Sequence, residues 1–173
     1  MVRKFTYDAR RILTFAEEQA RRFNDEYVGS EHLLMGLWKD MGGDDWLIGE
    51  KRYRSAPGNI LSNLGLGFPE AFIPQLFSRK VETASKNRLP IPHTPKYTAE
   101  VRETFKKACK CARELGHDYV GAEHVILGLL DLKTGFASEI LAKEGVIGLI
   151  TEETLDFMGV DDETHARYIE YRK

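Results

Sequence analysis

One eleven-residue segment occurs twice in this chain, and this repetition restricts the possible folds more than any other feature. YVGSEHLLMGL begins at Tyr27 and YVGAEHVILGL begins at Tyr119, with seven of the eleven positions identical. The likeness extends over residues 4–37 and 96–129 at a constant offset of 92, with 13 of the 34 positions identical. Self-similarity of this kind indicates duplicated supersecondary units that bury a shared core.

The second half of each copy matches at a different offset. ILSNLGL, residues 60–66, is similar to ILAKEGV, residues 140–146, at an offset of 80. The first copy therefore holds about 12 additional residues between its second and third elements. They lie within residues 40–58, which include Trp46 and a basic run.

Each copy shows the apolar spacing of an amphipathic helix, with apolar residues three and four positions apart. In the first copy these residues are Ala9, Ile12, Leu13, Ala16, Ala20 and Phe23, and in the second copy they are Val101, Phe105, Ala108, Ala112 and Leu115. No segment shows the alternation of a strand, so we expect none.

Residues with a known preference for helix ends flank the two long helices. Thr6 and Thr98 precede them and are predicted N-caps. Asn24 and Gly116 follow them, where a left-handed backbone is tolerated. Ser30 is predicted to cap the next helix of the first copy.

We predict an all-α fold of about eight helices in two pseudo-symmetric sets of four. A third helix is expected at 56–64 and 137–143, and a fourth from Pro69 and over 151–158. The predicted layout is a first repeat at 1–86 with an insertion near 40–58, a proline-containing linker at 87–95 and a second repeat at 96–160. A charged tail follows at 161–173, and it is either a solvated helix or the start of a linker.

Composition and charge exclude several classes of protein. The formal net charge is -2 and no basic block stands out, so we expect no nucleic-acid partner. No apolar run approaches the roughly 20 residues that span a bilayer, and the N-terminus lacks the apolar core of a secretory signal. Cys109 and Cys111 lie within a predicted helix on different faces, so we expect reduced packing residues and a cytoplasmic location.

The two copies together resemble a known family, the N-terminal domain of Clp AAA+ unfoldases such as ClpC and ClpA. The segments that carry the resemblance are FTYDARRILTFAEEQARRF, YVGSEHLLMGL, ILSNLGL, YTAEV, CARELGHDYVGAEHVILGLL and ILAKEGV, spread over residues 4–158. The resemblance implies two four-helix repeats that bind adaptor and client proteins and pass them to an ATPase ring. A phosphate-binding loop with its lysine is absent from the sequence, so this chain is not the motor itself.

The resemblance also implies one phosphoarginine pocket in each repeat. The matching residues are Thr6, Glu31, Thr98 and Glu123. A carboxylate can take the guanidinium by paired hydrogen bonds, while N–H groups at a helix start and a threonine hydroxyl can hold the phosphate. The alternative is purely structural, with glutamates that complement the helix dipole and threonines that only cap.

Histidines and cysteines carry no recognisable chemistry in this sequence. His32 and His124 follow the two glutamates, and we expect them to face away from these and to form hydrogen bonds inside the fold rather than hold a metal. His93, His117 and His165 form no cluster with them. We therefore predict no catalytic residue, no metal and no cofactor.

Several functional alternatives stay open on the sequence. Trp46 either binds a partner or folds back on the first repeat. The chain is either part of a Clp ATPase or a free-standing accessory protein that docks on, or competes with, such a machine. An enzyme acting on phosphoarginine and a purely structural scaffold are the remaining alternatives.

Overall fold

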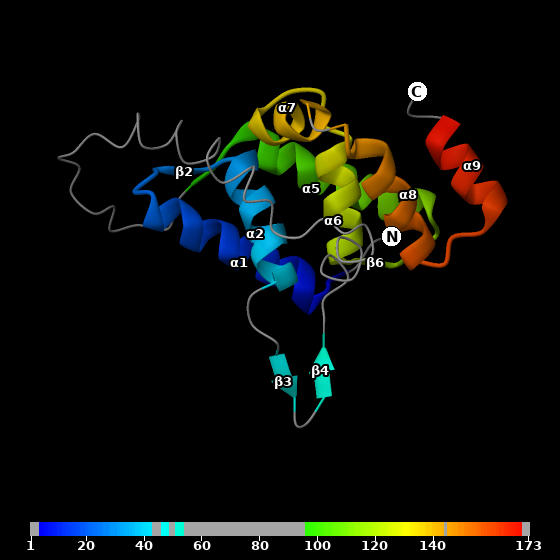
Figure 1. The fold of residues 1–173 in the computed structure, drawn as a ribbon, viewed down its shortest axis with the longest axis horizontal. Helices are drawn as coiled ribbons and strands as arrows, with labels where there is room; N and C mark the ends of the chain where they lie inside the picture. The colour runs from blue at the N-terminus through cyan, green and yellow to red at the C-terminus, as the bar shows by residue number, and fades with distance from the viewer. Residues whose placement is uncertain (1–3, 43–45, 49–50, 54–95, 144, 171–173) are drawn as a thin grey trace.

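The computed structural model describes residues 4–42, 46–48, 51–53, 96–143 and 145–170 (Figure 1). The helices in these ranges are α1 (Tyr7–Arg22), α2 (Ser30–Gly42), α5 (Ala99–Glu114), α6 (Ala122–Leu130), α7 (Phe136–Lys143), α8 (Ile147–Phe157) and α9 (Asp162–Glu170). The predicted all-α class is confirmed. Helix α7 lies where it was predicted, and α8 begins four residues earlier than predicted. The predicted helices at 56–64 and from Pro69, and the linker at 87–95, lie outside the described residues.

Short strands are present, and here the sequence prediction is wrong. They are β1 (Lys4–Phe5), β2 (Tyr27–Val28), β3 (Trp46–Ile48), β4 (Lys51–Tyr53), β5 (Lys96–Tyr97) and β6 (Tyr119–Val120). Strands of two or three residues are too short to show the alternation by which a strand is recognised in a sequence.

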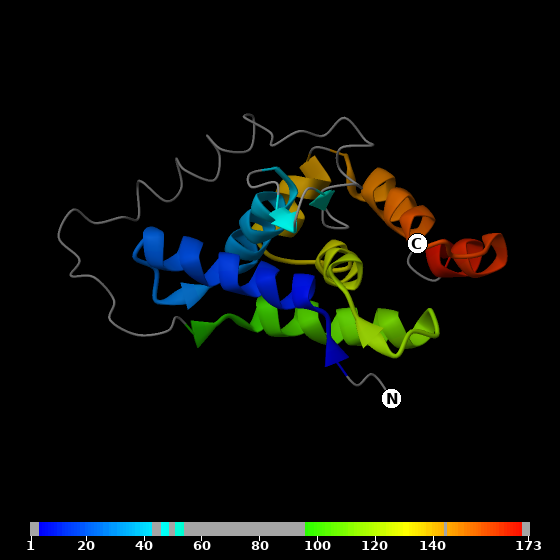
Figure 2. The ribbon, with the colours of Figure 1, turned by 90° about the horizontal axis from the view of Figure 1, so that it is seen from below.

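The strands join each repeat to the other. Strand β1 pairs in parallel with β6, and β2 pairs in parallel with β5. Since β5 is the repeat equivalent of β1, and β6 of β2, the two pairings are reciprocal. Figure 2 shows the result, with α1 and α5 running in opposite directions and one strand pair at each end.

The long helices bury the predicted apolar stripe. In α1 the buried residues include Ala9, Ile12, Ala16 and Ala20, while Leu13 and Phe23 are partly buried against the same core. The N-caps Thr6 and Thr98 are confirmed, because their hydroxyl oxygens accept the N–H groups of Ala9 and Val101 at 3.3 and 3.4 Å. Asn24 and Gly116 have the predicted left-handed backbone, with φ of 56° and 75°.

The second helix of each repeat crosses the first at a glycine. A Cβ on Gly36 would lie 2.6 Å from the carbonyl oxygen of Ile12, and a Cβ on Gly128 would lie 2.5 Å from that of Thr104. Real Cβ atoms do not come this close to backbone. The recurring glycine of the motif therefore lets the two backbones touch.

Side chains reinforce the contact between the repeats. The hydroxyl of Tyr97 in the second repeat donates a hydrogen bond to Glu17 of α1. Burial and this carboxylate raise the pKa of Tyr97 to about 12. At the equivalent position of the other pairing, the ring of Phe5 packs edge-on against Phe105 with centroids 5.6 Å apart.

The charged C-terminal tail contains a docked helix. In α9, Tyr168 is buried and its hydroxyl lies 3.4 Å from the Sγ of Cys111 in α5. Together with Leu127 and Leu155 these residues form a second apolar cluster. Residues 162–170 are therefore folded against the second repeat, not fully solvated and not an extended linker. Cys111 is buried and Cys109 is partly exposed, as predicted.

The insertion contains an antiparallel hairpin. Strands β3 and β4 pair with Trp46 opposite Tyr53, and Figure 1 shows the hairpin extending away from the helices. The remainder of the insertion from 43 to 58, and the direction of the Trp46 side chain, lie outside what the structure describes. The choice between a binding role and a packing role for Trp46 stays a prediction.

Candidate functional site

The strand pairing places each predicted threonine beside the other repeat. The backbone N–H of Thr6 donates to the carbonyl of Val120 at 2.9 Å, and that of Thr98 donates to Val28 at 3.0 Å. Glu123 lies three positions after Val120 in the sequence, and Glu31 lies three positions after Val28. Thr6 is therefore brought toward Glu123, and Thr98 toward Glu31. From the sequence we expect one pocket in each repeat. The strand pairing groups Thr6 with the Glu123 turn and Thr98 with the Glu31 turn, and the pockets themselves stay a prediction.

Both glutamates bend back over the glycine that precedes their helix. A Cβ on Gly121 would lie 2.0 Å from a carboxylate oxygen of Glu123, and one on Gly29 would lie 2.2 Å from Glu31. The carboxylates thus occupy the space that only glycine leaves open. At a helix start they complement the partial positive charge of unpaired N–H groups.

The two carboxylates differ in exposure. The side chain of Glu31 is 21% exposed and that of Glu123 is 11% exposed. Burial works to raise the pKa of Glu123, but a hydrogen bond from the residue's own backbone N–H works to lower it, and the pKa lies below its ordinary value. Glu123 is therefore an anion at neutral pH, although it is nearly enclosed.

The adjacent histidines hold these turns together. Both rings are fully buried, and the Nδ1 atoms of His32 and His124 accept the N–H of Gly29 and Gly121 at 3.0 Å. This bond from the third helical residue to the cap resembles half of a capping box. The predicted structural role agrees with this geometry, but the expectation that each histidine faces away from its glutamate is wrong. The Nδ1 atoms lie 3.5 and 3.4 Å from the glutamate oxygens because the carboxylates turn back.

Two further residues contact these histidines and were missed in the sequence. The Nε2 of His32 lies 3.0 Å from Asp25, and the Nε2 of His124 lies 2.8 Å from the Nδ1 of His117. The expectation that His117 forms no cluster with His124 is therefore wrong. Asp25 and His117 occupy equivalent positions, seven residues before the two histidines. Comparing the copies position by position would have paired Asp25 with His117, but their contacts with the histidines are visible only in the structure.

Ser30 does not cap α2, contrary to the prediction. The helix starts at Ser30 itself, and the first helical bond runs from the N–H of Leu33 to the carbonyl of Gly29. The buried hydroxyl of Ser30 instead donates to Glu100 of the second repeat at 2.8 Å. The close cross-repeat contact redirects the hydroxyl, and Ala122 at the equivalent position has none to offer.

In the part of the chain that the structure describes, no three His, Cys, Asp or Glu side chains gather into a metal-binding group. Among the same residues, no helix combines the length and the apolar character needed to cross a bilayer.

A family model for the Clp repeat (R) N-terminal domain matches residues 3–47 and 96–156. This match covers more than half of the chain and both copies of the repeated unit. The chain belongs to the Clp repeat N-terminal domain family.

Relatives of this Clp repeat domain include much longer proteins. The chain is 28% identical over 163 residues to the negative regulator of genetic competence ClpC/MecB of Bacillus subtilis, covering 94% of this chain and 18% of that protein. It is 32% identical over 141 residues to a probable ATP-dependent Clp protease ATP-binding subunit of Chlamydia pneumoniae, covering 82% of this chain and 15% of that protein. The chain thus spans under a fifth of the length of these relatives.

Solved structures share the fold of the Clp repeat domain. The Hsp104 N-terminal domain from Candida albicans aligns with a TM-score of 0.66 at 15% identity, covering 92% of this chain and 94% of that one. The N-terminal domain of ClpD from Arabidopsis thaliana aligns with a TM-score of 0.57 at 20% identity, covering 90% and 94%. At these identities the likeness supports the fold alone.

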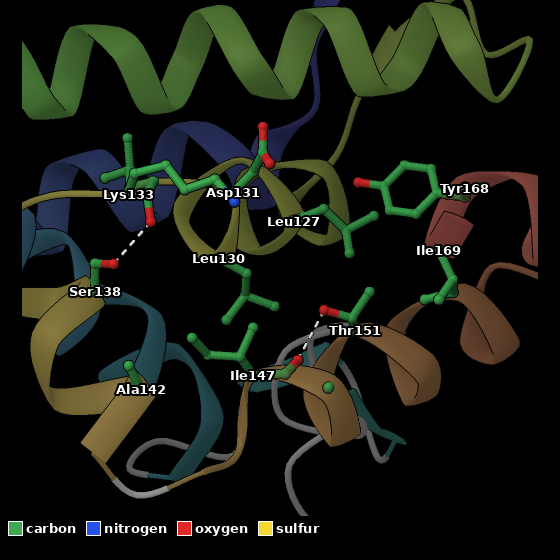
Figure 3. A pocket seen from close by; sticks show the side chains of 12 residues that line it. Leu127, Leu130, Asp131, Lys133, Ser138, Ala142, Ile147, Thr151, Tyr168 and Ile169 are labelled. Atoms are coloured by element: carbon green, nitrogen blue, oxygen red, sulfur yellow. Dashed lines mark hydrogen bonds between the residues drawn. The ribbon is translucent and has the colours of Figure 1, made fainter. Parts of the chain in front are cut away.

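An apolar pocket of about 380 Å³ lies elsewhere in this Clp repeat domain, between α6, α7, α8 and α9 (Figure 3). Leu127, Leu130 and Ile147 point into it, with Tyr168 and Ile169 of the C-terminal helix at one side. None of the four predicted site residues lines this pocket. The predicted residues Thr6, Glu31, Thr98 and Glu123 therefore lie apart from this hollow.

Replacing Gly121 by alanine is expected to push the Glu123 carboxylate off its helix start, because the new methyl group takes its place. We expect a loss of about 1 kcal/mol of unfolding free energy at neutral pH. The pKa of Glu123 should rise, since its contact with the backbone N–H is lost. A carboxyl group with a lowered pKa stabilises the fold above its unfolded pKa, and this stability is lost as the pH falls through the folded value. The stability difference between wild type and variant should therefore narrow as the pH falls below the ordinary glutamate value of about 4.3. Urea unfolding across pH, with NMR titration of Glu123, measures both effects.

Gly148→Ala is the matched control for this variant, because nothing lies within 4 Å of a Cβ added in α8. It should leave the Glu123 titration unchanged. An unaltered Glu123 titration in Gly121→Ala would contradict the placement of the carboxylate.

Proposed function

We propose that this chain is a non-catalytic domain that binds client or adaptor proteins on behalf of a Clp ATPase. Membership of the Clp repeat N-terminal domain family supports this proposal, as does a relative described as an ATP-binding subunit of an ATP-dependent Clp protease. Because the chain matches under a fifth of these relatives, their ATP-dependent activity is not carried over to it.

The observation that carries the proposal is the doubling of one chemical arrangement across the repeats. Thr6 lies with the turn that bears Glu123, and Thr98 with the turn that bears Glu31. Each turn combines a hydroxyl, a carboxylate and the first N–H groups of a helix. Such a set suits a ligand with a cation beside an anion, and phosphoarginine in a client protein is the ligand we propose.

Binding in this way requires a rearrangement of each glutamate. The carboxylates cover their own helix starts, bent over Gly29 and Gly121. A phosphate takes over this position, while the carboxylate turns outward to meet the guanidinium. The capping hydroxyl of each threonine already accepts an N–H and can still donate to a phosphate oxygen.

Calorimetric titration of free phosphoarginine tests the proposal. We expect two sites per chain in the wild type, and at least roughly tenfold weaker binding in Glu31→Gln/Glu123→Gln, because a charged hydrogen-bond partner contributes about 1.5–3 kcal/mol. The ligand should be recovered unchanged, since the proposed domain does not catalyse. Its hydrolysis would favour the enzyme alternative.

The variant Glu26→Ala/Asp118→Ala is the matched control. These exposed acidic residues occupy equivalent positions five residues before the two glutamates, so the variant removes the same number of negative charges nearby. It should bind like the wild type. Equal weakening in both variants would reduce the effect to net charge, and the absence of any heat with the wild type would refute phosphoarginine as the ligand.

A further inference from the structure

The two buried histidines of the repeats have different partners for the same nitrogen. The Nε2 of His32 meets the carboxylate of Asp25 at 3.0 Å, whereas the Nε2 of His124 meets the Nδ1 of His117 at 2.8 Å. The bond from the glycine N–H to Nδ1 is the same in both turns. The two histidines therefore differ in the partner of their second nitrogen.

The hydrogen bonds fix where the protons are. Because the Nδ1 of His124 accepts the N–H of Gly121, its proton is on Nε2 and is donated to His117. His117 can accept only while its own Nδ1 carries no proton. A carboxylate accepts from a neutral and from a protonated imidazole alike. Protonation of His117 thus breaks the hydrogen bond between His117 and His124. Protonation of the His32 ring does not break its hydrogen bond to Asp25.

Aromatic and charged groups surround His117, and they shift its pKa in opposite directions. Its ring stacks on Tyr119 with centroids 5.2 Å apart and is nearly parallel to it. Burial and the neighbouring His124 lower the pKa of His117, against the opposite influence of Glu123 and Asp118. His117 is therefore neutral at pH 7, and it takes up a proton only below the ordinary histidine value of about 6.5.

We propose that the His117–His124 pair is a proton-sensitive latch that holds the Gly121–Glu123 turn closed at neutral pH and releases it on mild acidification, while the Gly29–Glu31 turn stays closed. Protonated His117 turns an N–H toward the Nε2–H of His124, so the bond becomes a repulsion. The His124 ring then loses its anchor and ceases to accept the Gly121 N–H. Since Gly121 directly follows β6, the turn and its pairing with β1 loosen together.

The pH window follows from the direction of the shift. A histidine with a lowered pKa in the folded state stabilises the fold above its unfolded pKa, and this stability is lost as the pH falls through the folded value. The latch is thus complete near pH 7.5 and weakens below about pH 6.5. Its consequence for ligand binding rests on the proposed function, but the latch itself does not.

Amide hydrogen exchange measured by NMR tests the latch without any ligand. Between about pH 7.5 and about pH 5.5, we expect the protection factor of the Gly121 amide to fall roughly tenfold and that of Gly29 to stay constant. His117→Asp copies the first repeat and should abolish the fall. His117→Asn supplies a neutral acceptor oxygen and should do the same, which keeps the test decisive if the aspartate variant folds poorly. Asp25→His should transfer the pH dependence to Gly29.

A constant Gly121 protection factor in the wild type, or an unchanged fall in both His117 variants, would overturn the latch.

Titration with a phosphoarginine peptide separates failure of the latch from failure of the proposed function. We expect two sites near pH 7.5 and one near pH 5.5 in the wild type, but two at both pH values in His117→Asp. Two wild-type sites at both pH values would overturn control of binding by the latch. No binding at any pH, with the exchange pattern as expected, would leave the latch standing and refute the phosphoarginine site.

Discussion

Replacing both Gly36 and Gly128 by alanine is expected to lower the free energy of unfolding by about 4 kcal/mol. Each new methyl group would lie 2.6 Å or less from a backbone oxygen of the crossing helix, so the helices must move apart. Overpacking costs about 1–3 kcal/mol per site, and the upper end applies here because the atoms in the way belong to backbone. The better helix propensity of alanine returns about 1 kcal/mol, which leaves about 2 kcal/mol per site. The two contacts lie in different repeats and share no partner, so their effects should add.

Urea unfolding followed by circular dichroism measures this loss. A domain of this size has a total stability of roughly 5–15 kcal/mol, so the double variant should be close to the limit of folding. Gly148→Ala is the control, since its methyl group meets nothing within 4 Å and should be neutral or slightly stabilising. A double variant as stable as the wild type would show that the helices do not cross at these glycines.

Replacing His32 by alanine is expected to cost about 3 kcal/mol of unfolding free energy. The ring is fully buried, so its loss leaves a cavity and deprives the Gly29 N–H of its acceptor. The carboxylate of Asp25 also loses the donor at 3.0 Å. Thermal and urea unfolding measure the loss, and exchange of the Gly29 amide should accelerate together with it.

The comparison variant for His32→Ala is His165→Ala in α9. His165 is a partly exposed residue whose ring lies 3.7 Å from Asp156, a distance typical of a weak surface pair. We expect a change of at most about 0.5 kcal/mol. Similar losses in both variants would mean that the hydrogen bond between the Gly29 N–H and the His32 ring does not stabilise the turn.

Local signals in the sequence predicted most of the helical structure. The apolar stripe that begins at Ala9, the caps Thr6 and Thr98 and the left-handed end at Asn24 each depend on neighbours within a few residues. The repetition of YVG-x-EH in both copies also located the turns that bear Glu31 and Glu123. These features follow from the sequence because their energies arise within one or two helical turns.

The composition of the candidate sites could not be read from the sequence. The pairing of β1 with β6 and of β2 with β5 assigns Thr6 to the turn of Glu123 and Thr98 to that of Glu31. The turned-back carboxylates and the Ser30 hydroxyl bond to Glu100 likewise depend on tertiary contacts. Two-residue strands have no pattern of their own, and their partners are chosen by packing across the whole domain.

The amino-acid sequence by itself determined the duplication, the helices and the chemical groups available at each turn. Only the tertiary structure decided which segments lie together, because β1 and β6 are more than a hundred positions apart in the sequence and β2 and β5 about seventy. The same holds for the histidine partners. The sequence contains Asp25 and His117 at equivalent positions, but only the folded chain brings one carboxylate and one imidazole to the same nitrogen of two equivalent rings.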